Sequence, residues 1–249
     1  TDGALGTSAV TINGGTLEVN GQGGNNQNRD ILRGDVTING GQLLIKGDNN
    51  KVVDTNVTVN TNGTMKLDGS GSDMLDYGKT GKSITVDGGT LDFDTTRQTM
   101  GSWKLNLSNG ARVIGAGNET YGALDYNKET GNVINATAGD NTIESKIRLR
   151  STNTAGTELA FNVADAASLN VSGLVHSDGA KNGIITKQGT GTLHLNNANN
   201  DLARINVTGG TANIHGAAEY TLAQLQADTK VEVGFFAGDT KNTTTKSTV

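Results

Sequence analysis

The sequence contains no cysteine and no proline among its 249 residues. The lack of cysteine excludes a disulfide scaffold and any metal centre held by thiolates. Average usage puts proline at about 5% of residues. Its absence is typical of a chain built almost entirely from paired strands and tight turns, because proline removes a donor from a strand ladder. Without proline, a collagen triple helix is excluded as well.

Charge and long apolar runs are also scarce. Charged residues make up 18% of the chain and the net charge is −5, so no basic surface indicates a nucleic-acid partner. No run of 18 apolar residues occurs, and no membrane-spanning helix is predicted. Glycine (36 residues), threonine and asparagine are abundant, which disfavours a helix bundle. The chain begins at Thr1 without a signal peptide, so we expect it to be a piece of a longer protein.

A repeat of two alternating strands joined by a Gly/Asn turn predicts the fold. Clear copies span 10–21, 36–47, 57–69, 84–94 and 105–114. Weaker copies follow at 133–145, 161–173, 185–195 and 205–216, and a last one begins near Val231. The mean spacing of about 24 residues fits one turn of a β-helix and is too short for a propeller blade. We therefore predict an all-β, parallel β-helix of about ten rungs over residues 1–237, with a polar tail or linker at 238–249.

The aligned copies assign side chains to columns, because alternate residues of a strand face opposite sides. We expect two buried columns, Ile12, Ile38, Val59, Val86 and Leu107, and Val19, Ile45, Leu67, Phe93 and Ile114. Thr11, Thr37, Thr58 and Thr85 should point outward, one above another. Arg112 occupies the place of Leu17 and Leu43, which indicates a register slip of one residue at that copy.

Long and short copies alternate, and the long copies carry inserts at 22–35, 69–81 and 115–131. Equivalent loops of a solenoid project from one side, so we expect the three inserts to share one face. One interpretation is that they pack on their own turns. The other is that they form a binding surface, with Tyr77, Tyr121 and Tyr126 as aromatic anchors. The first insert also ends in Arg33-Gly34-Asp35, the tripeptide that integrins bind, although Asp35 could instead serve the turn into the next strand.

Candidate chemistry is sparse elsewhere. Asp92 and Asp94 point the same way, as the carboxylate pair of a β-helical glycosidase would, but a charged solvent face is the better interpretation. His194 and His215 lie one turn apart without a third ligand. We expect no enzymatic activity, no cofactor and no bound metal.

Residues 183–201 and 205–214 resemble the passenger-associated β-strand repeat of bacterial autotransporters. Its Thr-Lys-x-Gly-x-Gly-Thr-Leu core is matched by Thr186, Lys187, Gly189, Gly191, Thr192 and Leu193. The resemblance implies a right-handed β-helix that is exported through the periplasm and outer membrane by a C-terminal outer-membrane barrel, and that stays at the cell surface or is secreted. The nearest stretch to the Gly-Asp-Ser-Gly of protease-type passengers is Gly69-Ser70-Gly71-Ser72-Asp73, which departs from that order.

These observations lead to a functional hypothesis. The chain is a non-enzymatic stalk of a surface autotransporter. It mediates adhesion to a host surface or matrix ligand, or self-association with identical passengers, through lateral polar surfaces and insert loops. The alternative is a β-helical carbohydrate-active enzyme or glycan-binding module. A third possibility is an inert spacer. No nucleic-acid partner is expected.

Overall fold

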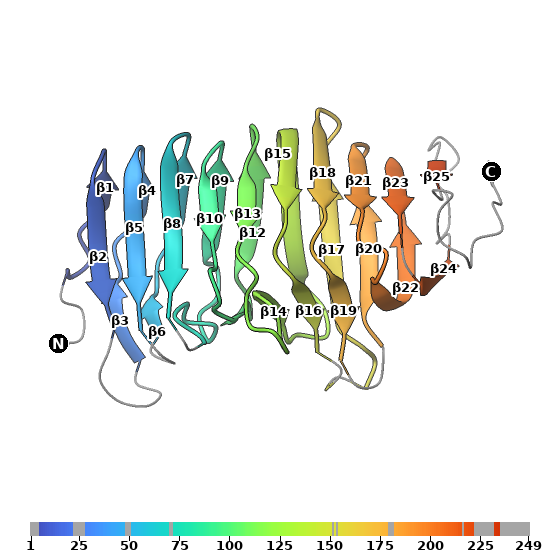
Figure 1. The fold of residues 1–249 in the computed structure, drawn as a ribbon, viewed down its shortest axis with the longest axis horizontal. Helices are drawn as coiled ribbons and strands as arrows, with labels where there is room; N and C mark the ends of the chain where they lie inside the picture. Colours follow the sequence, from blue (N-terminus) through green and yellow to red (C-terminus); the bar gives the residue numbers. More distant parts are fainter. Residues whose placement is uncertain are drawn as a thin grey trace.

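The computed structural model describes residues 5–21, 28–47, 51–69, 72–150, 152, 154–178, 182–215, 217–221 and 232–234. These residues form an all-β rod, a parallel β-solenoid of about seven complete turns (Figure 1). The predicted fold class is confirmed, whereas the count of ten rungs is not. The described residues include no helix that is long and apolar enough to cross a membrane. The predicted tail at 238–249 and parts of the first two inserts lie outside the described residues.

The first two sides of each turn are the two strands of the repeat. The first side consists of β1 (Val10–Ile12), β4 (Val36–Ile38), β7 (Val57–Asn60), β9 (Ser83–Asp87), β12 (Lys104–Ser108), the first part of β15 (Asn132–Ile143), β17 (Glu158–Val163), β20 (Ile184–Gln188), β22 (Asp201–Val207) and β24 (Ala217–Thr221). The second side consists of β2 (Thr16–Asn20), β5 (Gly41–Lys46), β8 (Gly63–Asp68), β10 (Thr90–Asp92), β13 (Arg112–Ile114), the last part of β15, β18 (Ala167–Val171), β21 (Thr192–Leu195), β23 (Thr211–Ile214) and β25 (Glu232–Gly234). The weaker copies thus also form strands in parallel register.

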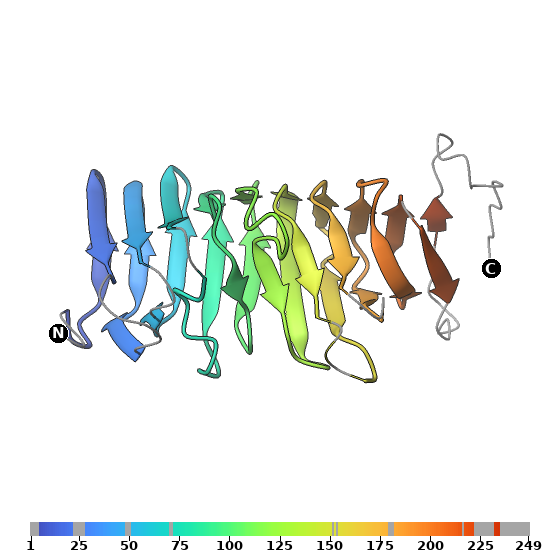
Figure 2. The same ribbon diagram turned by 60° about the horizontal axis from the view of Figure 1, so that its bottom comes forward.

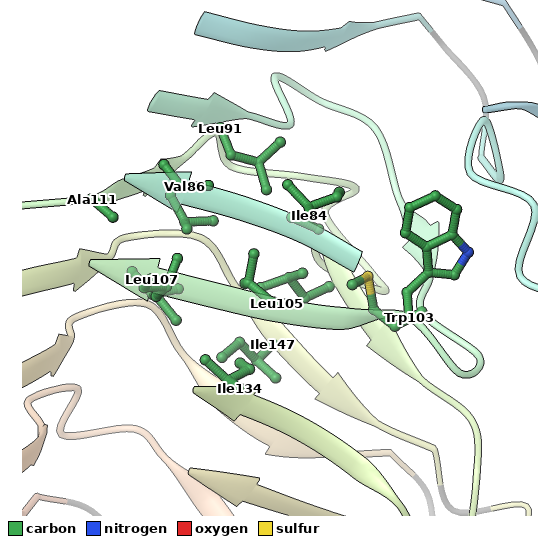
Figure 3. Packing of buried hydrophobic residues seen from close by; sticks show 14 of the residues in the cluster. Ile84, Val86, Leu91, Trp103, Leu105, Leu107, Ala111, Ile134 and Ile147 are labelled. Carbon is green, nitrogen blue, oxygen red and sulfur yellow. The ribbon is translucent and has the colours of Figure 1, made fainter. Parts of the chain in front are cut away.

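The first predicted core column is confirmed. Ile12, Ile38, Val59, Val86 and Leu107 are direct partners on successive strands, and none is more than 5% exposed. Figure 3 shows Val86 and Leu107 from neighbouring strands of this side, with Ile84 and Leu105 beside them. Stacking identical apolar positions fills the narrow interior, because each turn repeats the width of the one before.

In the second predicted core column, the register shifts by one residue at the copy that contains Arg112. Leu91 pairs with Val113, and Asp92 pairs with Ile114. Val113 is fully buried, while Ile114 is only half-buried and lies on the outward side of its strand. The prediction of Ile114 as a core residue was therefore wrong, and the predicted slip of one residue is confirmed.

Polar columns cover the outside of the first side. Thr11, Thr37, Thr58 and Thr85 lie in register on successive strands, as predicted. At the adjoining turn, Asn39 Nδ2 donates to Asn13 Oδ1 at 2.9 Å, and Asn60 Nδ2 donates to Asn39 Oδ1 at 2.7 Å. These ladders satisfy amide groups without exposing apolar surface.

A third side completes each turn, and the strand pattern did not predict it. Its short strands are β3 (Asn28–Leu32), β6 (Lys51–Val53), β11 (Gln98–Thr99), β14 (Leu124–Tyr126), β16 (Ile147–Leu149) and β19 (Val175–Ser177). β11, β14, β16 and β19 pair in parallel, β3 pairs with β6, and Val53 forms a bridge with Leu75. In Figure 1 the strands labelled β3, β6, β14, β16 and β19 run along the lower edge, which comes forward in Figure 2.

The third side explains the inserts. The described parts of all three inserts contribute to it, through β3, Leu75 and β14, so their predicted position on one face is confirmed. They are not additions to two-sided turns, because the short copies supply β6 and β11 to the same side. The long copies differ only in the length of the loops around this third strand.

Lys187 shows what the Thr-Lys-x-Gly-x-Gly core does. Its side chain lies inside the solenoid between Phe161 and Val207 and is 0% exposed. Its Nζ atom donates to the carbonyls of Gln188 at 2.9 Å, Gly189 at 2.8 Å and Gly209 at 3.0 Å. Burial lowers the pKa of Lys187 to about 8. The buried ammonium group therefore satisfies the carbonyls of two stacked turns.

Candidate functional site

An open pocket of about 530 Å³ lies on the outer surface of the third side. Four successive turns supply its lining, which is Asp73 and Tyr77, then Arg97 and Thr99, then Tyr121 and Asn127, and finally Arg148, Arg150 and Thr152. Parallel rungs are about 4.8 Å apart, so the pocket extends along the rod axis by roughly three of these spacings. It brings together the second and third inserts and two turns that carry none.

An outward-facing column of polar residues on the third side includes Thr99 and Arg148 of the pocket lining. Thr99 pairs with Asp125, Asp125 with Arg148, and Arg148 with His176. In β14 the neighbours of Asp125 are the core residues Leu124 and Tyr126. Asp125 therefore points away from the core, and yet it is 0% exposed because the surrounding side chains cover it.

Three arginines converge on Asp125. Arg150 donates from Nε to Oδ1 at 3.0 Å and from Nη2 to Oδ2 at 2.7 Å. Arg148 Nη1 lies 3.4 Å and Arg97 Nε 3.5 Å from Oδ2. Arg150 Nη2 also donates to Thr99 Oγ1 at 2.9 Å. One buried carboxylate thus orients three guanidinium groups in the pocket lining.

Asp73 connects the second insert to the next turn. Its Oδ1 accepts a hydrogen bond from the Thr99 backbone N–H at 2.9 Å, and its Oδ2 lies 3.4 Å from Arg97 Nη2. The backbone of Asp73 has a φ of 61°, in the left-handed region that aspartate tolerates better than most residues. These contacts fix the insert against the charged cluster.

Tyr121 lies at the tip of a tight turn in the third insert. Asn118 Oδ1 accepts hydrogen bonds from the backbone N–H groups of Thr120 at 3.0 Å and Tyr121 at 3.1 Å. Tyr121 is 38% exposed, with the guanidinium carbon of Arg148 at 4.5 Å and that of Arg97 at 5.2 Å from its ring centroid. These cation–π contacts hold the ring beside the arginines.

Tyr77 borders the pocket from the second insert and is 36% exposed. Lys51 Nζ lies 4.4 Å from its ring centroid. The backbone is fixed by Gly101, where a Cβ atom would lie 2.2 Å from the Tyr77 carbonyl oxygen. Two exposed tyrosines from different inserts therefore stand beside one pocket.

Burial and neighbouring charges shift the pKa values of three bases in or near the pocket. The pKa of Lys146 is lowered by burial and by the charge of Arg148. The pKa of His176 is lowered by burial and then by Lys146 and Arg148. The hydrogen bonds from Arg150 to Asp125 raise the pKa of the Arg150 guanidinium. Burial is therefore the main reason that Lys146 and His176 lose their protons more readily, whereas Asp125 makes Arg150 hold its proton more tightly.

Tyr126 is not part of this surface. Its side chain is 0% exposed in the core, its Oη atom has no hydrogen-bond partner among the described residues, and burial raises its pKa. The expectation that all three insert tyrosines serve as surface anchors is corrected on this point. The central residue of β14 faces outward, so Tyr126 at the end of the strand faces inward.

The Arg33-Gly34-Asp35 tripeptide lies at the corner between β3 and β4, away from the pocket. Arg33 and Asp35 are exposed. Gly34 packs so closely that a Cβ atom would lie 2.0 Å from the Ser8 carbonyl oxygen. Asp35 Oδ1 accepts hydrogen bonds from Thr55 Oγ1 at 2.9 Å and Asn56 Nδ2 at 3.3 Å. The glycine and the aspartate thus both have structural roles at this corner.

The remaining candidates stay apart from the pocket. Asp92 and Asp94 lie 4.0 and 3.7 Å from Lys66 Nζ on the second side. His194 Nδ1 lies 3.1 Å from Asn213 Nδ2. Within the described ranges, no group of three or more histidine, aspartate or glutamate side chains is arranged to hold a metal ion.

Sequence reasoning found Tyr77 and Tyr121 but missed Asp125 and the three arginines. A signal was present, because the triplets Leu124–Tyr126 and Ile147–Leu149 each place one charged residue between two apolar ones.

Comparisons of the chain with protein-family models, with curated proteins and with solved structures give no match.

Proposed function

We propose that this chain is the non-enzymatic, right-handed β-helical stalk of a secreted surface autotransporter, with about ten rungs over residues 1–237. It mediates adhesion or cell–cell self-association through its lateral polar surface and insert loops. In the full-length protein a C-terminal outer-membrane barrel exports it through the periplasm and outer membrane, and it remains at the cell surface or is secreted. Its partners are identical passengers or a ligand on a host surface or matrix.

The observation that carries this proposal is the position of Tyr77 and Tyr121. They come from two different inserts, each is more than a third exposed, and both border the same pocket. An inert spacer needs no such pocket, whereas exposed aromatic residues beside oriented charges are typical of binding surfaces. The rod repeats its polar columns at every turn, so many weak lateral contacts can add to this site by avidity.

The pocket carboxylates support binding rather than catalysis. A general acid or base must reach the proton that it transfers. Asp125 is 0% exposed and is shared by three arginines, and Asp73 is held by Arg97 and the Thr99 N–H.

The second candidate function is that of a glycan-binding module or carbohydrate-active enzyme. It is favoured by the convergence of one aspartate, three arginines and two tyrosines in one pocket.

The test is adhesion by microspheres that carry the purified chain at a defined density. We expect these microspheres to aggregate or to bind host cells or matrix proteins, and the Tyr77→Ser/Tyr121→Ser double variant to lose this activity. The matched control is Glu18→Ser/Lys46→Ser, which removes an exposed ion pair on the second side. Circular dichroism verifies that both variants retain their strand content. Undiminished adhesion by the tyrosine variant would contradict the proposal, and turnover of a polysaccharide by the wild-type chain would favour the enzyme.

A further inference from the structure

We infer that the pocket between the second and third inserts binds an acidic sugar, with the arginines taking its carboxylate and the tyrosines contacting its ring. This inference rests on the proposed function, because it names the ligand class of the same adhesive site. It draws on the charged groups that line the pocket, on the unused donors of its arginines and on its aromatic borders.

The charged groups that line the pocket favour an anion, because three are arginines and one is an aspartate. Arg97, Arg148 and Arg150 line the pocket, and the carboxylates that hold them there are Asp73 and the buried Asp125. Arg148 also pairs with Asp178, so three aspartates hold the three arginines, but Asp73 is the one carboxylate among the lining residues.

Donors remain for a ligand. Within the part of the chain that the structure describes, the Nη1 atoms of Arg97 and Arg150 donate no hydrogen bond, and neither atom is buried. The other nitrogens of Arg150 are engaged by Asp125 and Thr99, so the plane of its guanidinium group is fixed before a ligand arrives. A preoriented guanidinium group is well suited to a planar carboxylate.

The rest of the lining favours a sugar over a simple inorganic anion. Tyr77 and Tyr121 border the pocket with partly exposed rings, and such rings pack against the apolar face of a ligand while their hydroxyl groups stay hydrated. Thr152 supplies a further hydroxyl group. The volume of about 530 Å³ suits a small organic ligand rather than one phosphate or sulfate ion. Because the pocket is open and extends along the rod, a longer saccharide could continue beyond it.

The test measures binding of uronic-acid oligosaccharides to the purified 249-residue chain by isothermal titration calorimetry. The matched ligand is the same oligosaccharide after reduction of its carboxyl groups to alcohols. We expect the reduced ligand to bind about tenfold more weakly or not at all, since a hydrogen bond to a charged group is worth at least that factor.

Variants locate the site. Arg97→Gln and Tyr121→Ala should each weaken binding by about tenfold, while Arg112→Gln on the second side should leave it unchanged. Thr152→Trp places a bulky side chain in the pocket lining and changes no arginine, so it should block binding even if the other variants prove unstable. Thermal unfolding of each variant verifies folding.

Three results would overturn the inference. The first is equal affinity for the native and the reduced oligosaccharide. The second is equally tight binding of inorganic phosphate or sulfate that Tyr121→Ala leaves unchanged. The third is equally tight binding of an acidic peptide. If any of these occurs while microsphere adhesion still depends on Tyr77 and Tyr121, only the ligand class is wrong. If uronate binding is verified but adhesion is absent, the adhesive function is wrong.

Discussion

Arg150 and Asp125 form a two-pronged ion pair across adjacent turns, with Nε 3.0 Å from Oδ1 and Nη2 2.7 Å from Oδ2. Asp125 is fully buried, although it occupies an outward-facing position on β14. Its desolvation is tolerated only because cations surround it. The stability of this part of the rod and the geometry of the pocket therefore depend on the same carboxylate.

Replacing Asp125 with alanine should lower the free energy of unfolding by about 3 kcal/mol, because it leaves three neighbouring arginines without their shared partner. Arg112→Ala is the matched control. It breaks the exposed pair with Glu144, whose side chains are about half exposed, and should cost less than about 1 kcal/mol. Urea unfolding of the two variants measures the difference. Equal losses of unfolding free energy would show that Asp125 contributes no more to stability than an exposed ion pair.

Lys187 should make stability depend on pH in a defined window. Its pKa is about 8 in the folded chain and 10.5 in a model peptide, so between these values the unfolded chain binds more protons. The free energy of unfolding should therefore rise with pH across this window. Lys187→Met should lack this rise. Denaturation curves near the two ends of the window test the prediction, which fails if wild type and variant change in parallel.

Gly34, at the corner between β3 and β4, and Gly14, in the turn between β1 and β2, provide a matched pair of glycines. Alanine at Gly34 would place Cβ 2.0 Å from the Ser8 carbonyl oxygen, whereas no atom lies within 4 Å of a Cβ at Gly14. We expect Gly34→Ala to destabilise the first turns by about 1–3 kcal/mol through overpacking. Gly14→Ala should be neutral or stabilising by up to about 1 kcal/mol. Chemical denaturation distinguishes these outcomes, and similar effects at both sites would contradict the close packing of Gly34.

Substitutions at Ile38 test whether each turn of the solenoid depends only on the turns next to it. It is 0% exposed between Ile12 and Val59. Ile38→Ala should cost about 2–5 kcal/mol, while Ile38→Val should cost about 0.5–1.5 kcal/mol. Because each turn contacts only its neighbours, Ile38→Asp should open the first turns and leave later ones protected. Hydrogen exchange resolved along the sequence would show this gradient, and uniform loss of protection would exclude it.

The sequence predicted the first two sides of the rod because their strands alternate over several residues and recur in register. Even the slip at Arg112 was visible, since a charged residue cannot take the place of Leu43 in the core. The third side escaped prediction because β11 has only two residues and β14 only three, which is too short for a periodic signal. The pocket could not be foreseen for the same reason, because the third side brings its arginines together.

Among the insert tyrosines, Tyr126 should contribute to the stability of the fold, whereas Tyr77 and Tyr121 should contribute to binding. Because its ring is fully buried, Tyr126→Ser should cost about 3–5 kcal/mol, as for other large aromatic truncations. Tyr126→Phe should be neutral or stabilising, since the buried Oη has no hydrogen-bond partner among the described residues. Neither Tyr77→Ser nor Tyr121→Ser should change stability by more than about 0.5 kcal/mol beyond the loss of their cation–π contacts. Thermal unfolding of the four variants tests this order. A destabilised Tyr126→Phe variant would show that the hydroxyl group has a hydrogen-bond partner. A Tyr126→Ser variant as stable as the wild type would show that the ring is exposed like those of the other two tyrosines.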